Sequence, residues 1–195
     1  MSEPIPLVDT DEVNIPADIY AAVGQVACSS ALLERTVREV LRQVVSGHES
    51  SWVIFEGRSL DQMLEDAKAI SRDWAAWRAS WPPGAIVIAA FASAIDEARS
   101  VNQLRNQLIH GVLSPTDTSL GKATYPRGQA FGEPTYYFAR SRPRRGAVVM
   151  GFTSSGIRQI SKEIDEAASN LLGTLEEAIC QRPGGHRLLP SLDLS

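Results

Sequence analysis

Four long segments of the chain repeat apolar residues at alternating steps of three and four, the spacing that places them on one face of an α-helix. In the first segment the apolar or small residues fall at positions 19, 23, 26, 30, 33, 37, 40 and 44. Pro16 stands just before this stripe, where its fixed φ suits the first turn of a helix, and Ser46-Gly47 marks the expected end. The pattern therefore predicts one long helix between these points.

Three further helices follow from the same spacing and from local start and stop signals. The second opens at Ser59-Leu60-Asp61-Gln62, where a hydroxyl precedes a glutamine by three residues in the capping-box pattern. The third covers about 85–110, and Gly111 follows it at the position where a positive φ favours glycine. The fourth is capped by Thr153 or Ser154 and ends before a proline–glycine segment.

Amphipathic helices that are joined without interleaved strands predict an all-α fold, here an up-down bundle of four to five helices. The insertion 112–153, between the third and fourth helices, differs in character. Its β-prone runs 135–139 and 147–152 flank a turn with proline and glycine, which predicts a small β-hairpin before the last helix. Two stretches stay undecided between strand and loop, namely 52–55 and the segment 114–134, which is rich in Gly, Pro, Ser and Thr.

The composition indicates one soluble domain. A chain of 195 residues with 44% hydrophobic and 22% charged residues fits a single core, and no apolar run reaches the ~18 residues of a membrane helix. We expect a flexible arm over 1–15, the helical domain over 16–181 and a tail over 182–195. Cys28 and Cys180 lie beside apolar neighbours, so we expect buried free thiols. Together with an acidic N-terminus unlike a signal peptide, this predicts a cytoplasmic protein.

The charge is unevenly distributed. The whole chain carries −4, whereas the segment 122–158 holds seven basic residues against one acid, +6 by difference. Because screening limits electrostatics to about 8–10 Å, such a patch can bind a polyanion on an acidic protein. The candidate RNA contacts are Arg140, Arg142, Arg144 and Arg145 near the hairpin turn. The alternative is a solvated hairpin tip without a ligand.

The densest cluster of chemical groups is Arg105-Asn106-Gln107-Leu108-Ile109-His110-Gly111, at the end of the third helix. Asn106 and His110 are four residues apart and share a helix face. Arg105 lies at the edge of the apolar stripe, where an unpaired charge is costly. It should therefore have a carboxylate partner, for which Glu34 is the best candidate, or a phosphate-like ligand, or a facing subunit.

In this context Arg105-Asn106-x-x-x-His110-Gly111 resembles the R-x4-6-H motif of the HEPN superfamily. The order of elements over about 17–181 is also similar to that of this family of small helical domains, many of which are ribonucleases that need no metal and no cofactor. Such proteins often act as toxins or in phage defence, some with an antitoxin or regulatory protein partner. One subgroup has a tyrosine two residues after the histidine, where this chain has Val112.

The resemblance implies a division of roles in RNA cleavage. Histidine titrates near neutral pH, which suits His110 to proton transfer. Arg105 would supply a permanent charge and a forked set of donors to the phosphate oxygens, and Asn106 would orient a phosphate oxygen or the 2′-hydroxyl. One histidine per chain leaves acid or base unfilled, so the family's homodimer with a shared cleft is expected here too.

Two alternatives belong to other classes. The first is a catalytically inactive HEPN-like module that binds RNA, a nucleotide or a protein. The second is an unrelated bundle in which Arg105 and His110 only cap the helix end, because basic side chains there interact favourably with the helix dipole. His48 and His186 lie in expected loops without cysteines or acids at ligand spacing, so no metal site is predicted.

Overall fold

The computed structural model describes residues 15–44, 55–77, 82–114, 135–142 and 146–180. These residues form four helices, which are α1 (Ala17–Val44), α3 (Leu60–Trp77), α4 (Pro82–Ile109) and α5 (Ser154–Cys180). A small sheet contains β1 (Val112–Ser114), β2 (Tyr136–Arg142) and β3 (Gly146–Phe152). The predicted helical class, with a hairpin before the last helix, is confirmed. Several expectations lie outside the described residues, namely those for 1–14, the helix end at 46–47, positions 52–54, segment 115–134 and the tail.

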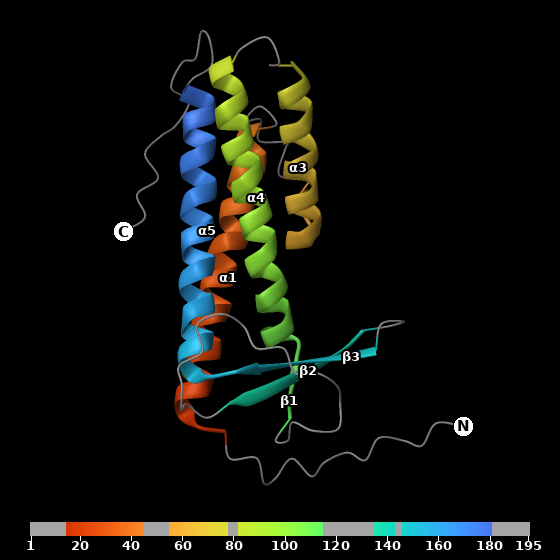
Figure 1. The fold of residues 1–195 in the computed structure, drawn as a ribbon, viewed down its shortest axis with the longest axis vertical. Helices are drawn as coiled ribbons and strands as arrows, with labels where there is room; N and C mark the ends of the chain where they lie inside the picture. The colour runs from red at the N-terminus through yellow and green to blue at the C-terminus, as the bar shows by residue number, and fades with distance from the viewer. Residues whose placement is uncertain (1–14, 45–54, 78–81, 115–134, 143–145, 181–195) are drawn as a thin grey trace, which may run out of the picture.

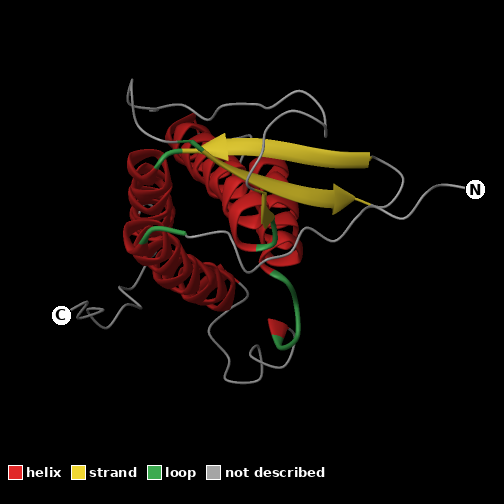
Figure 2. Cartoon of the chain, turned by 90° about the horizontal axis from the view of Figure 1, so that it is seen from below, coloured by secondary structure: helices red, strands yellow, loops and turns green. Residues whose placement is uncertain are grey.

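The helices lie side by side and the sheet crosses one end of the bundle, where α1 and α5 begin and α4 ends (Figure 1). Helix α5 packs along both α1 and α4. The α1–α5 contact includes a buried hydrogen bond of 2.8 Å between the hydroxyls of Ser29 and Ser161. Viewed from below, the strands extend across the helix ends and project to one side (Figure 2).

Helices α3, α4 and α5 alternate in direction along the bundle (Figure 1). Helices α1, α3 and α5 run one way along the bundle and α4 runs the other way (Figure 1). Helices α1 and α3 are therefore parallel. Hydrophobic spacing identifies which face of a helix is buried but carries no information about helix direction.

The predicted stripes form the core. On α1 the predicted positions Ile19, Val26, Leu33, Val37 and Val40 are all at most 2% exposed. The corresponding stripes of α4 and α5 meet them, and their largest fully buried side chains are Phe91, Ile95, Leu108, Ile157, Ile164 and Leu171. Burial of such side chains is the main stabilising contribution in a bundle of this kind.

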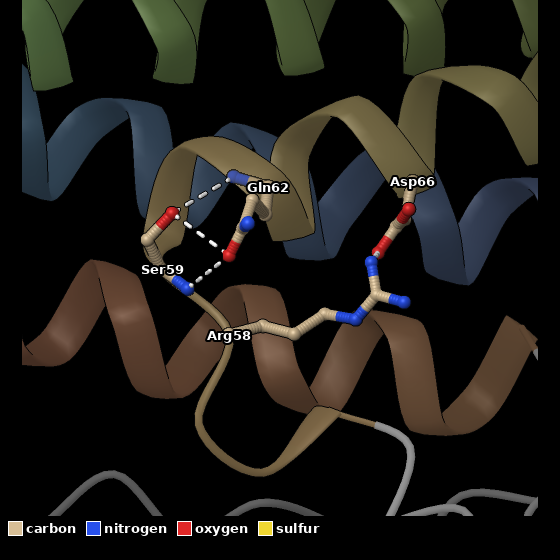
Figure 3. A network of polar contacts seen from close by, with 4 residues as sticks. All are labelled: Arg58, Ser59, Gln62 and Asp66. Atoms are coloured by element: carbon tan, nitrogen blue, oxygen red, sulfur yellow. Dashed lines mark hydrogen bonds and ion pairs between the residues drawn. The ribbon is translucent and has the colours of Figure 1, made fainter.

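The capping box at the start of α3 is confirmed. The backbone N–H of Gln62 donates to Ser59 Oγ at 3.3 Å, and the N–H of Ser59 donates to Gln62 Oε1 at 2.9 Å (Figure 3). Arg58 Nη1 donates to Asp66 Oδ2 at 2.6 Å, across the first turns of the same helix. The beginning of α3 at Leu60 is therefore held by reciprocal bonds.

Helix α4 begins three residues before the expected start at about 85. Pro82 and Pro83 occupy its first turn, where a missing N–H costs nothing because that donor has no partner within the helix. At its other end the chain passes through His110 and Gly111 directly into β1. This third strand was not predicted, because three residues are too few to show a strand pattern.

The sheet has the order β1-β2-β3 and is antiparallel throughout. Phe138 pairs with Leu113 on one side and with Met150 on the other. The rings of Phe138 and Phe152 lie edge to face, with centroids 5.6 Å apart and planes at 76°. Both side chains belong to the core, so they anchor the sheet to the bundle.

The expected burial of Cys28 is wrong, since its thiol is free and exposed. The side of α1 opposite the core is itself partly apolar, with Tyr20 61% and Leu32 40% exposed. Apolar neighbours in the sequence therefore did not indicate which side was buried. None of the described helices combines the length and apolar character that a membrane span requires.

Candidate functional site

Arg105 and Asn106 lie in the last turns of α4, and His110 follows directly after the helix, next to the sheet. Arg105 Nη1 donates to Asn106 Oδ1 at 2.8 Å, so the guanidinium lies against the amide. The backbone N–H of His110 donates to the carbonyl of Asn106 at 3.3 Å, which closes the last turn. The imidazole of His110 is exposed, whereas Arg105 and Asn106 are half-buried. The helix end therefore carries an exposed histidine and a half-buried arginine.

The charge of Arg105 is not neutralised by a carboxylate in the described part of the chain. Its Nε atom is buried and has no hydrogen-bond partner there. The expected pairing with Glu34 is absent, since Glu34 forms an ion pair with Arg38. These two residues are four apart on α1, a spacing that places their side chains next to each other on the helix surface, where opposite charges attract. Within the described residues, Arg105 therefore has neither Glu34 nor another carboxylate as its partner.

Helix α3 supplies polar partners to only part of α4. Further up the bundle, polar residues of α4 at steps of three each meet a residue of α3: Asp96 bonds Lys68, Arg99 bonds Glu65, and Asn102 Nδ2 donates to Asp61 Oδ1 at 2.6 Å. Because α3 begins at Leu60, it supplies no further side chain beyond this last pair. Arg105 and Asn106 occupy the next turn of α4.

Gly111 has a role other than the one expected. Among the described glycines only Gly57 has a positive φ, at 77°, so the predicted left-handed helix end is wrong. A Cβ on Gly111 would instead lie 2.5 Å from the carbonyl oxygen of Gln107 and 3.0 Å from Cβ of Phe138. The chain therefore needs glycine here because the last turn of α4 and strand β2 both approach this position closely.

Gln107, inside the motif, is a residue whose role the sequence did not reveal. Its side chain is 2% exposed, and its Nε2 donates to the backbone carbonyl of Phe138 at 3.2 Å. A buried amide is satisfied only by such a partner. The signal available in the sequence was a glutamine on the apolar side of α4, beside Leu108.

The structure describes only part of the predicted basic patch. Arg140 and Arg142 lie on β2, paired in register with Val148 and Gly146 of β3. Arg144 and Arg145 fall outside the described residues. Strand β2 therefore leads from Phe138, at the helix end, toward the arginine-rich turn.

No protein-family model matches this chain, and neither does any curated protein or solved structure.

Proposed function

We propose that this protein is a metal-independent endoribonuclease of HEPN type. The observation that carries the proposal is that Arg105, which meets no carboxylate among the described residues, lies five residues before the exposed His110 at the same end of α4. The site needs an anion to complete it, and the phosphate of RNA is an anion with oxygens suited to a guanidinium. The resemblance to the R-x4-6-H motif supports RNA as the substrate.

The proposed reaction is transesterification within the RNA strand. A base removes the proton of a 2′-hydroxyl, the 2′-oxygen attacks the adjacent phosphorus, and the bond to the 5′-oxygen breaks as an acid protonates it. The products are a 2′,3′-cyclic phosphate and a 5′-hydroxyl. His110 serves in proton transfer, Arg105 stabilises charge on the non-bridging oxygens, and Asn106 holds Arg105 and orients the substrate.

The reaction requires an acid and a base, and each chain offers one histidine at this site. We therefore propose a homodimer in which two copies of the motif line a shared cleft. A biological role as a toxin or in phage defence, with an antitoxin or regulatory partner, and a cytoplasmic location are consistent with this chemistry. The alternative is a HEPN-like module that binds RNA or a protein without cleaving.

The test is cleavage of single-stranded RNA in excess EDTA. We expect the wild type to release fragments with 2′,3′-cyclic phosphate ends and His110→Ala to be slower by at least about 100-fold, the usual contribution of a proton-transfer group. Gln103→Ala is the matched control, because Gln103 is exposed on the same helix two turns earlier. RNA binding without cleavage by the wild type would favour the inactive module.

A further inference from the structure

Three separate contacts fasten the end of α4 to one residue of the sheet. The buried side chain of Gln107 donates to the carbonyl of Phe138 at 3.2 Å. Gly111 allows the close approach of Phe138, whose Cβ would stand 3.0 Å from any Cβ at that position. Strand β1, which begins at Val112, pairs with β2 around the same residue. The helix end and β2 therefore meet at one residue, Phe138, and we call this contact the junction.

The junction fixes the path of the hairpin relative to the motif. Strand β2 continues from Phe138 through Arg140 to Arg142 without a break in its pairing to β3. At about 3.3 Å per residue, these positions lie about 7 Å and 13 Å along the strand from the junction. Alternate residues of a strand fall on the same face of a sheet, so positions 140 and 142 share a face. An arginine at each position offers a forked set of donors that suits a backbone phosphate.

We propose that Gln107 is a positioning residue that holds the hairpin as a fixed arm for the RNA backbone, so that the enzyme prefers single strands long enough to reach Arg140 and Arg142. The inference rests on the proposed function for its substrate. It adds that affinity for long RNA depends on a side chain that touches neither substrate nor reacting atoms.

The mechanical part of the inference is tested without RNA. Gln107→Leu keeps the size of the side chain and removes the amide, so amide hydrogen exchange should rise at least tenfold in 110–114 and 136–139. Gln103→Leu makes the same change at an exposed site of α4 and should leave these rates unaltered. Gly111→Ala, which disturbs the junction from the other side, is the second variant if Gln107→Leu does not fold. Unchanged exchange in the junction would overturn the inference.

The RNA part is tested by a double-mutant cycle in the His110→Ala background, which prevents cleavage during binding. Gln107→Leu should weaken binding of a 20-nucleotide strand about tenfold and of a dinucleotide less than twofold. It should also lower the slope of log affinity against log salt, by up to about 0.7 for each phosphate that the arm no longer binds. In a protein that already carries Arg140→Ala and Arg142→Ala, Gln107→Leu should have no further effect.

The outcomes separate the inference from the function. Suppose that the wild type binds and cleaves RNA. The inference then fails if Gln107→Leu weakens the binding of long and short strands equally. It also fails if Gln107→Leu still weakens RNA binding in the protein that lacks Arg140 and Arg142, because Gln107 would then have only a structural role. If the wild type neither binds nor cleaves RNA, the ribonuclease function fails and the RNA arm fails with it.

Discussion

Two stretches of α4 carry similar polar residues in different surroundings. In the upper stretch Arg99 is neutralised by Glu65, and its neighbours Asp96 and Asn102 also meet partners on α3. In the lower stretch Arg105 lies six residues further on, contacts Asn106, and has no carboxylate among the described residues. One helix therefore carries an arginine that is paired with a carboxylate and an arginine that meets no carboxylate among the described residues.

The difference follows from where α3 begins. Its capped start at Leu60 provides partners as far as Asn102 and no further. Below that point α4 meets the sheet, which contacts Gln107 and Gly111. An arginine that is half-buried and not neutralised is costly, and such a site is a candidate for ligand binding because the ligand removes the cost.

Gly111→Ala should give the largest change in stability, because the new Cβ would lie 2.5 Å from the carbonyl oxygen of Gln107. We expect a decrease of about 1–3 kcal/mol in the free energy of unfolding, typical of overpacking. Gly173→Ala on α5 is the control, since nothing lies within 4 Å of its Cβ position, and it should be neutral or stabilise. Equal stability of the two variants in urea unfolding would argue against a tight helix–sheet junction.

Asn106→Asp should give Arg105 a carboxylate partner, as Arg99 has in Glu65. The new carboxylate would keep the contact with Arg105 Nη1 and neutralise its charge. We expect RNA cleavage to slow about tenfold, since an oxyanion would then compete with a fixed anion for the guanidinium. Gln103→Glu adds the same charge at an exposed site of α4 and should change the rate less than twofold.

Glu39→Gln should change the free energy of unfolding least, because it removes a partly exposed charge that is paired with Arg42 on the same helix. Arg42 donates to both carboxylate oxygens of Glu39, at 2.9 and 2.6 Å, and lowers the pKa of that carboxyl. The lowered pKa stabilises the folded protein at neutral pH, and this contribution is lost as the pH falls through the folded-state pKa. We expect less than about 1 kcal/mol at pH 7, disappearing in acid, by urea unfolding across pH. A difference that grew on acidification would contradict the pairing.

Much of the fold could be predicted because the spacing of apolar residues and the capping residues indicate where the helices lie. The stripes, the capping box at Ser59 and the hairpin before α5 all follow from local patterns. The parallel direction of α1 and α3 could not be predicted, since hydrophobic spacing carries no information about direction. The strand β1 could not be predicted either, because three residues are too few to show a periodic signal. The exposure of Cys28 was missed because both sides of that part of α1 are apolar.

For the candidate site, the sequence locates the cluster but not its contacts. Arg105, Asn106 and His110 lie near the same end of one helix, and their spacing along the sequence is enough to predict this. The absent pair with Glu34 and the bond from Gln107 to β2 depend on which segments meet in space. Tertiary contacts of this kind are not encoded in the spacing of residues along one helix.

The comparison of Arg105→Ala with Arg99→Ala in RNA cleavage with EDTA tests the central claim most directly. Both variants remove an arginine from α4, and both should keep the helical fold by circular dichroism. We predict that Arg105→Ala slows cleavage by at least about 100-fold, the usual effect of removing a donor to a transition-state oxyanion, and that Arg99→Ala slows it less than about threefold. Equal rates for the two variants, or cleavage by Arg105→Ala at the wild-type rate, would contradict the assignment of a catalytic site to the lower end of α4.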